Sequence, residues 1–403
     1  MARAPAARTD EPATRGPTVL MAESIAADYE SASARAVGAS HAVAFAFARH
    51  ALSSLLQCCG LERGDEVALS PLTCKVVPLA LIWAGLRPVY VDISAATLNI
   101  DPEQLVRRLG SKTRAVMFQH TYGSDAGVAD IAQVARDHRS LLVEDCAQCL
   151  PVQDGRYAPG RTGRGAVFSN NLLKPLPAAS GGLVTTDDGD LATRVRDARD
   201  RLPVRNWSAA AMLRAQVWLY RGLVRPSSYW PILDLYKRVS PSYRPRPIAD
   251  EIADEVAGLA FRPSAFQTRG GERWLARLPA IAAHRRACCN DYAERLSRAA
   301  GRIELPPVGE GQPLLYFPVL TDRKTATLQA ARARRLPIIP WPGATVIYPV
   351  ERMEALPAYG YEPGSCPVAE SVASRLIGLP TDPDITAGHR ERIAGIVTEV
   401  AAT

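Results

Sequence analysis

The stretch GAVFSNNLLKPLPAASGG, residues 165–182, contains one lysine, Lys174, among apolar, amide and small residues. No Asp, Glu, Arg or His occurs between Arg164 and Asp187, so this cation has no charged neighbour nearby in the sequence. Either its aliphatic stem covers apolar surface while the ammonium reaches solvent, or a desolvated amine is kept there for chemistry. The runs GAVFS and GGLVTT on either side predict two strands, with Lys174 in the connection between them.

Short β-rich runs alternate with helix-length segments in the region before Lys174. The predicted strands are HAVAFA (41–46), EVALSP (66–71), RPVYVDI (87–93), RAVMFQH (114–120) and SLLVEDC (140–146), and the predicted helices cover 49–59, 73–84, 102–109 and 127–137. This alternation predicts an α/β fold with a mostly parallel central sheet and helices on both faces. Ligands bind such sheets at the carboxyl ends of the strands. Asp145 and Ser169 both lie at predicted strand ends.

Composition narrows the class of ligand and the compartment. The chain has 48 Lys and Arg against 41 Asp and Glu, a net charge of +7 without a dense basic block, which favours a small anionic ligand over nucleic acid. No apolar run is long enough for a secretory signal or a membrane span. The eight cysteines have no disulfide spacing, so we expect reduced thiols and a cytoplasmic protein. Cys146 and Cys149 form a CAQC pair, but no second Cys/His pair follows it, so no metal site is expected.

The chain of 403 residues is long enough for more than one domain. We expect a disordered tail over 1–20, a large α/β domain over 21–270 and a smaller C-terminal α+β domain over 271–403. The last of these rests on a helical stretch at 281–300 and on the strand candidates LLYFPVL (314–320) and LPIIPW (336–341).

Residues 201–250 break the α/β pattern and form an insert. They hold three of the six tryptophans and nine basic residues, with Asp234 and Asp250 as the acids. Arg214, Arg221 and Arg225 fall on one stripe of a helix. Two interpretations stay open: a helix buried against the rest of the protein or a second subunit, or an interfacial helix that contacts anionic lipid or a lipid-linked substrate.

Four polar side chains near Lys174 suggest a cofactor. LLVEDCAQ (141–148) ends a strand with Asp145 and has Gln148 three residues later, and Ser169 precedes Lys174 by five residues. An acid, an amide, a hydroxyl and an isolated lysine are what a pyridoxal 5'-phosphate (PLP) site requires. A free lysine at pH 7 lies about 4.6 kcal/mol from its nucleophilic form, and condensation with an aldehyde removes the ammonium altogether.

Several segments resemble the DegT/StrS family of PLP-dependent sugar aminotransferases, which has the type I aminotransferase fold. They occur in family order: GLERGDEVALSPLTCKVVPLALIWAGLRPVYVDIS (60–94), AVMFQHTYG (115–123), LLVEDCAQ (141–148), FSNNLLKPLPAASGGLVTTDD (168–188) and, more weakly, LAFRPSAFQ (259–267) and CPVAESVASRLIGLP (366–380). The resemblance is good over about residues 25–200. It implies that Lys174 forms the internal aldimine, that Asp145 pairs with the pyridinium, that Gln148 lies on the ring's hydroxyl side and that Ser169 holds the phosphate. It also implies a homodimer.

Some positions depart from the family pattern. The usual Gly-Thr at an early helix start is Ala48-Arg49, so we expect Arg49 to replace the lost phosphate ligand, with a surface or structural arginine as the alternative. The stacking aromatic residue is Cys74, and the usual histidine before the lysine is Asn171.

Two further departures lie on either side of the insert. The usual Gly-Glu before the paired glycines is Ala179-Ser180, and the asparagine that reaches the partner's phosphate is Ala260. Lys75 and Arg262 are candidate contacts for an anionic substrate.

The favoured function is transfer of an amino group from an amino acid, glutamate first among the donors, to a keto group of a nucleotide-linked or otherwise activated sugar. One alternative is a PLP enzyme that catalyses elimination, dehydration or condensation on an amino-acid or lipid-like substrate. The other is a silent regulator or scaffold that keeps the fold without turnover. Retention of Lys174, Asp145, Gln148 and Ser169 argues against the last.

Overall fold

The computed structural model describes residues 17–155, 157–175, 180–205, 207–240, 243–244, 246–297, 301–308 and 311–403. Of the tail expected over 1–20, residues 1–16 lie outside this part, and helix α1 (Pro17–Val37) begins at Pro17. Proline suits the first turn of a helix because the N–H it lacks has no partner there. The helix therefore starts four residues earlier than the sequence analysis expected.

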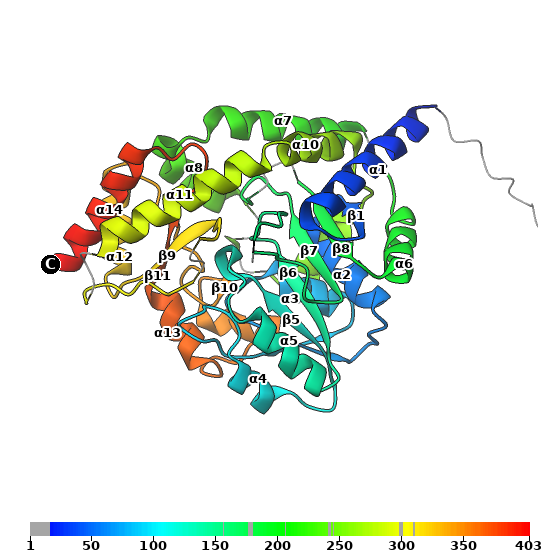
Figure 1. Ribbon diagram of the computed structural model, residues 1–403, viewed down its shortest axis with the longest axis horizontal. Coiled ribbons are helices and arrows are strands. Elements are labelled where there is room, and N and C mark those ends of the chain that lie inside the picture. Colours follow the sequence, from blue (N-terminus) through cyan, green and yellow to red (C-terminus); the bar gives the residue numbers. More distant parts are fainter. Residues whose placement is uncertain are drawn as a thin grey trace, which may run out of the picture.

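A seven-stranded sheet forms the centre of the molecule (Figure 1). Its strands are β1 (His41–Phe45), β2 (Glu66–Leu69), β4 (Arg87–Tyr90), β5 (Thr113–Gln119), β6 (Leu141–Cys146), β7 (Gly165–Ser169) and β8 (Gly182–Thr186). Their order is β1-β8-β7-β6-β5-β2-β4. Only β8 runs antiparallel to its neighbours, β1 and β7. The predicted mostly parallel sheet is confirmed, and each predicted strand before Lys174 is present.

Helices cover both faces of the sheet because the strands are apolar on both sides. The helices connecting the strands are α2 (Ala48–Cys58), α3 (Val76–Trp83), α4 (Pro102–Arg108) and α5 (Val128–Asp137), and α6 (Gly189–Asp200) follows the last strand of this sheet, β8. On β5, Ala115 and Met117 join the core formed with α2 and α3, whereas Val116 and Phe118 join the core formed with α4 and α5. This alternation of adjacent residues is the period of two expected of a strand.

The insert folds as helices along one side of the molecule. It contains α7 (Trp207–Leu223), a 3-10 turn at Pro226–Ser228, α8 (Tyr229–Val239) and α9 (Ile248–Glu255). Figure 1 shows α7 along the upper edge of the molecule, beside α10 (Ala265–Leu275).

The C-terminal part combines helices with short strands. Its elements are α11 (Leu278–Leu296), β9 (Tyr316–Leu320), α12 (Lys324–Ala333), β10 (Ile347–Tyr348), α13 (Pro367–Arg375), β11 (Leu376–Pro380) and α14 (Ala387–Ala402). Strands β9 and β11 pair antiparallel, and α11, α12 and α14 pack around them. These elements agree with the expected α+β composition of this part.

Two features of the C-terminal part differ from the sequence analysis. The strand predicted over 336–341 is wrong, since only Ile339 makes a bridge there, to Gly378. Pro337 and Pro340 lack the N–H groups that a strand would use. In addition, β10 pairs with the short strand β3 (Thr73–Cys74) and packs into the large core, so the packing does not separate cleanly at residue 271.

Candidate active site

The carboxyl ends of several strands meet at one edge of the sheet. Asp145 on β6 pairs with Val167 on β7, and Ser169 at the end of β7 pairs with Gly182. Gly182 also pairs with Phe45, the last residue of β1. The strand register therefore brings the acid, the hydroxyl and the start of α2 to the same edge, as expected for a ligand site in an open α/β sheet.

Asp145 is a buried acid at the end of β6. Its side chain is 6% exposed, and Oδ1 accepts a hydrogen bond from the N–H of Ala147 at 2.9 Å. Burial raises the pKa of Asp145, although the N–H of Ala147 and the positive charges of Lys174 and His120 oppose the increase. Among the described residues, Oδ2 accepts no hydrogen bond. A cationic N–H facing this oxygen would hold the carboxylate ionised.

Lys174 is half-buried in the bend that follows β7. Its backbone N–H donates to the carbonyl of Asn171 at 2.9 Å, which sets the turn. Within the described part of the chain, its ammonium forms no hydrogen bond or close ion pair, and its charge acts on Asp145. Residues 176–179, including Ala179, lie outside the described residues. The structure thus places an uncommitted amine near a buried carboxylate, which is the pairing that a Schiff-base cofactor requires.

A cradle with free donors lies beside these residues. Ser169 is 8% exposed, and its hydroxyl makes no hydrogen bond among the described residues. The first N–H groups of α2, on Ala48 and Arg49, likewise have no acceptor within that set. Residue 182 must be glycine, because a Cβ there would stand 2.5 Å from the Cα of Ala48. A phosphate placed between a hydroxyl and a helix start would satisfy these donors, so the site fits the phosphate of PLP.

Gln148 has a structural contact as well as its predicted role. Its Oε1 accepts from the backbone N–H of Tyr122 at 2.8 Å, and its side chain is 8% exposed. Tyr122 in turn donates its hydroxyl to the carbonyl of Trp341. Gln148 therefore links the end of β6 to the C-terminal part of the protein, and its position beside the ring of the cofactor stays a prediction.

The guanidinium of Arg49 contacts Glu255 at the end of α9, although it stays near the start of α2, 5.8 Å from the ring of Phe47. Its Nη1 donates to the backbone carbonyl of Glu255 and lies 3.9 Å from the carboxylate of the same residue. Burial lowers the pKa of Arg49, and the charges of Cys74 and Glu255 partly restore it. In this arrangement Arg49 offers a phosphate its backbone N–H rather than the side chain that the sequence analysis favoured.

Lys75 does not face an open site. Its Nζ lies 3.1 Å from the Glu251 carboxylate and 3.0 Å from that of Glu255, and the side chain is only 2% exposed. The expected contact with an anionic substrate is not what the structure shows, because two acids on α9, just after the insert, neutralise the ammonium. The residues around Lys75 in the sequence could not reveal these partners, because Glu251 is 176 residues away.

Three other predicted residues occupy positions at the border of the site. Cys74 is half-buried and pairs with Tyr348 through β3 and β10. Asn171 is exposed, and its Oδ1 accepts from the N–H of Leu173. Arg262 donates to Asp200 at 3.0 Å. Their roles in binding cofactor or substrate stay predictions.

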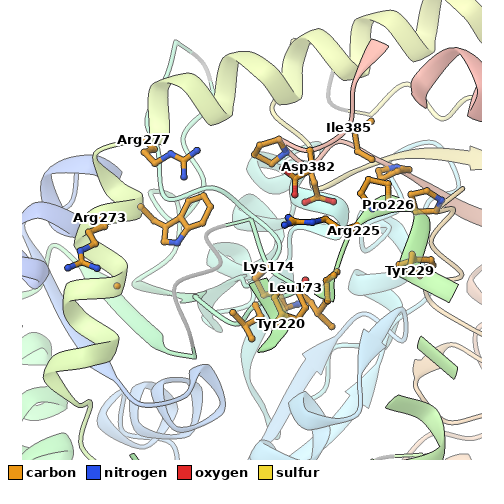
Figure 2. Close-up of a pocket in the computed structure, with 18 of the residues that line it drawn as sticks. Leu173, Lys174, Tyr220, Arg225, Pro226, Tyr229, Arg273, Arg277, Asp382 and Ile385 are labelled. Carbon is orange, nitrogen blue, oxygen red and sulfur yellow. The ribbon is translucent and has the colours of Figure 1, made fainter. Parts of the chain in front are cut away.

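A cavity of about 720 Å³ opens beside Lys174 (Figure 2). Five arginines line it, against the acids Asp382 and Asp384: Arg214, Arg225, Arg269, Arg273 and Arg277. Trp274, Tyr220, Tyr229, Phe266 and Tyr316 add aromatic surface. Asp145, Gln148 and Ser169 are not in its lining, so the cavity is a compartment on the outer side of Lys174.

The sequence analysis found only part of this basic lining. Arg214 and Arg225 belong to the predicted arginine stripe of the insert, and both face the cavity, whereas the side chain of Arg221 lies outside the described residues. Arg269, Arg273 and Arg277 were missed. Their spacing of four residues, which places successive residues on one helix face, was the available signal.

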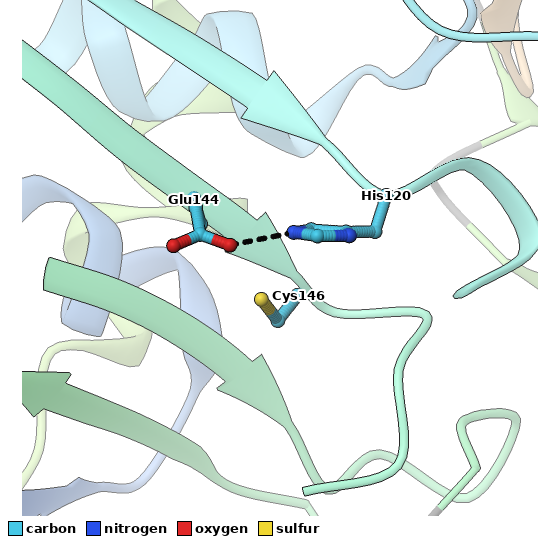
Figure 3. Close-up of side chains that lie close together, drawn as sticks. All are labelled: His120, Glu144 and Cys146. Carbon is cyan, nitrogen blue, oxygen red and sulfur yellow. Dashed lines mark hydrogen bonds and ion pairs between the residues drawn. The ribbon is translucent and has the colours of Figure 1, made fainter. Parts of the chain in front are cut away.

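His120, Glu144 and Cys146 form a buried cluster behind Asp145 (Figure 3). His120 Nε2 lies 2.8 Å from Glu144, whose oxygens also accept the N–H groups of Gly160 and Gly163, along with that of Thr162. Burial lowers the pKa of His120, but the charge of Cys149 and the hydrogen bond and charge of Glu144 outweigh it and raise the pKa to about 9. Burial raises the pKa of the Cys146 thiol. A protonated thiol and a carboxylate already occupied by donors favour a structural ion pair over a metal site.

All eight cysteines are free thiols. Among the described residues, no helix is both long and apolar enough to cross a lipid bilayer.

Comparison with known proteins adds to this geometry. The profile of the DegT/DnrJ/EryC1/StrS aminotransferase family matches residues 13–398. The chain is 25% identical to GDP-perosamine synthase from Caulobacter vibrioides over 93% of this chain and 89% of that protein. It is 36% identical to the spore coat polysaccharide biosynthesis protein SpsC from Bacillus subtilis, over 42% of this chain and 43% of that protein. The crystal structure of NtdA from Bacillus subtilis with bound cofactor PMP has the same fold, with a TM-score of 0.71 and 18% identity over 97% of this chain and 78% of that one.

Proposed function

Because this chain belongs to the DegT/DnrJ/EryC1/StrS aminotransferase family, we propose that it transfers an amino group from an amino acid, glutamate first among the donors, to the keto group of an activated sugar. The family confirms the predicted cofactor, PLP. The observation that carries the proposal is the position of Lys174. Its amine, which has no partner among the described residues, lines the arginine-rich cavity and acts on the buried Asp145, so we expect it to reach both a cofactor and a substrate.

Each residue of the proposed site has a separate role in the reaction. PLP, when bound, supplies an electron sink for the bond to the amino group. Lys174 would hold the cofactor covalently and, as a free amine, would move a proton at the substrate carbon. Asp145 would keep the pyridine nitrogen protonated. Ser169 and the start of α2 would hold the phosphate. The amino acid leaves as its keto acid, and the keto sugar leaves as an amino sugar.

The cavity favours an acceptor with phosphate groups. Five arginines against two aspartates give the lining a positive excess, and guanidinium groups bind phosphate through paired hydrogen bonds. GDP-perosamine synthase is named for a nucleotide-linked sugar. We therefore propose a nucleoside-diphosphate sugar or another diphosphate-linked sugar as the acceptor.

The half reaction tests the proposed chemistry. The purified protein is loaded with PLP and mixed with glutamate, and 2-oxoglutarate is measured in stoichiometric amount, with Lys174→Ala as the inactive variant and Lys112→Ala as a control at an exposed lysine. Formation of 2-oxoglutarate without ammonia supports transamination. Ammonia release from the amino acid, or no reaction with any amino acid, would instead support elimination chemistry or a silent scaffold.

The acceptor is tested separately. Arg273→Ala should raise the KM for a diphosphate-linked keto sugar roughly 10- to 100-fold, the cost of one charged hydrogen bond. The same variant should leave the KM for a neutral keto sugar and the rate of the glutamate half reaction unchanged. Equal effects on both sugars would contradict an anionic acceptor.

The family resemblance also supports a homodimer, which light scattering tests. An active monomer would overturn this part of the proposal.

The outer face of the insert suggests a contact of its own. Large apolar side chains are exposed on α7 and α8: Met212, Trp218, Leu219, Leu223, Leu235, Tyr236 and Val239. Among the side chains of α7 that the structure describes, Leu213 and Val217 pack inward, against Leu172 and Phe266. Lys237 and Arg238 lie in the last turn of α8, among these apolar side chains. A two-fold contact between copies through this face would bring such like charges together. We therefore propose that this face lies on an anionic lipid surface.

Sedimentation with vesicles tests the lipid contact. Vesicles with anionic phospholipid should retain the wild type more strongly than zwitterionic vesicles, and Leu219→Ser/Leu223→Ser should reduce the retention. If neither vesicle retains the protein and the same variant weakens a dimer in light scattering, the occupant is a second copy of the chain and the lipid proposal is wrong.

A further inference from the structure

Two segments on either side of the insert run together beside the start of α2. The N–H of Arg262 donates to the carbonyl of Pro203 at 2.9 Å, which joins the segment before α7 to the segment before α10. Arg205 follows in the first segment, and its guanidinium lies 5.8 Å from the ring of Phe47 and 5.7 Å from the ring of Phe261. Phe47 is the residue immediately before α2. Arg205 is thus held between two aromatic rings next to the free N–H groups of Ala48 and Arg49.

Arg205 has donors without acceptors. Its Nε and Nη1 are buried and, among the described residues, form no hydrogen bond. A buried N–H that lacks a partner costs about 1–3 kcal/mol, and more when it is charged. Two such donors on one guanidinium are therefore expected to face an anion.

Glu255, the acid near the start of α2, already has several cationic neighbours. Glu255 lies 3.0 Å from Lys75, 3.4 Å from Arg246 and 3.9 Å from Arg49. Arg49 is itself 5.8 Å from the ring of Phe47, so two guanidinium groups flank that ring. Together with the positive end of the α2 dipole, they leave an excess of positive charge. A phosphate carries close to two negative charges at neutral pH, and it would balance this excess.

The sequence lacks two side chains that bind the cofactor phosphate in the family it resembles. Compared with the family it resembles, the chain has Ala48-Arg49 in place of Gly-Thr and Ala260 in place of the asparagine that crosses from one subunit to the phosphate of its partner. Two side-chain ligands are therefore missing. The structure turns the guanidinium of Arg49 to Glu255, so Arg49 does not replace them.

We propose that Arg205 binds the phosphate of PLP, together with the Ser169 hydroxyl and the first N–H groups of α2. The insert would then supply a cofactor ligand of its own. This inference rests on the family's use of PLP and not on the proposed acceptor or on transamination, so it can fail while those stand.

Comparison of PLP with pyridoxal, which lacks the phosphate, isolates the contact. Dissociation constants are measured by absorbance titration of the apo protein with each compound, for the wild type, Arg205→Met and the exposed control Arg201→Met. Arg205→Met should raise the dissociation constant of PLP roughly 10- to 100-fold and change that of pyridoxal by no more than about two-fold. Arg201→Met should change neither. A loss that is equal for PLP and pyridoxal, or no loss, overturns the proposal.

A second measurement, the melting temperature with inorganic phosphate, tests the contact even if Arg205→Met folds poorly. Inorganic phosphate should raise the melting temperature of the wild-type apo protein, and Arg205→Lys, which keeps the charge, should retain part of that increase. Absence of any phosphate effect in the wild type contradicts the assignment. If Arg205→Met keeps its PLP affinity but a dimer dissociates in light scattering, Arg205 pairs with a carboxylate of a second copy, and the proposal is wrong.

Discussion

His120, just after β5, and Glu144 on β6 form a fully buried ion pair, 2.8 Å between Nε2 and the carboxylate (Figure 3). The backbone N–H of His120 also donates a hydrogen bond to the carbonyl of Asp145 at 3.1 Å. Glu144 also fixes the loop at 160–163 through backbone N–H groups. The pair therefore holds the end of β6, and with it Asp145, in position.

This pair predicts a loss of stability at alkaline pH. The folded pKa of His120 is about 9, above its ordinary value of 6.5, so its contribution is complete below pH 6.5 and disappears as the pH rises through 9. The melting temperature of the wild type should fall over this window. His120→Gln should melt lower at pH 6.5 and lose less on going to pH 9. The exposed variant His138→Gln is the control, and an identical slope in all three proteins would contradict the prediction.

Lys174 should carry the cofactor covalently. Borohydride reduction of the holo protein should fix PLP on the peptide that contains Lys174, as found by mass spectrometry. Lys174→Ala should bind PLP reversibly, lose the visible band of the lysine-bound cofactor and lose at least roughly 10³-fold in activity. Label on another lysine, Lys75 or Lys324 included, would show that the site is misassigned.

Asp145→Asn should separate chemistry from folding. The substitution keeps the size of the side chain and removes the charge that we propose pairs with the pyridine nitrogen, so the half reaction with glutamate should slow roughly 10²-fold or more. The melting temperature of the apo protein should stay near that of the wild type, because Oδ1 can still accept from Ala147. Asp130→Asn, at an exposed position on α5, serves as the control. A half reaction at the wild-type rate would remove Asp145 from the chemistry.

Lys75→Met should be a stability variant and not a substrate variant. Removal of the ammonium leaves the Glu251 carboxylate without the cation at 3.1 Å, while Glu255 keeps Arg246 and Arg49. Breaking a buried pair in this way costs about 3–5 kcal/mol. The double variant Lys75→Met/Glu251→Gln should recover part of the loss. Denaturant unfolding and the KM for the acceptor are measured together. A higher KM with unchanged stability would restore the substrate contact expected from the sequence.

The sequence by itself determined the fold and the centre of the site. Strand residues alternate between the two cores with a period of two, and α2, α4 and α5 follow their strands closely enough for local patterns to reveal them. Asp145 and Ser169 could be placed because the ends of parallel strands meet at one edge of a sheet. Lys174 could be singled out because its neighbours in the chain carry no charge. Each of these signals lies within a few residues.

Only the tertiary structure decided which charges are already paired. The ammonium of Lys75 is neutralised by Glu251, 176 residues away, and the guanidinium of Arg49 contacts Glu255 at the end of the same helix, α9. Arg205, in contrast, has buried N–H donors that find no acceptor among the described residues. The five arginines of the cavity come from two segments far apart in the sequence, Arg214 and Arg225 from the insert and Arg269, Arg273 and Arg277 from α10 and the residues after it. The physical reason is that local propensity and periodicity act between neighbours along the chain, while the partner of a charge depends on how distant segments pack. A lone lysine and a paired lysine therefore look alike in sequence and differ only in the fold.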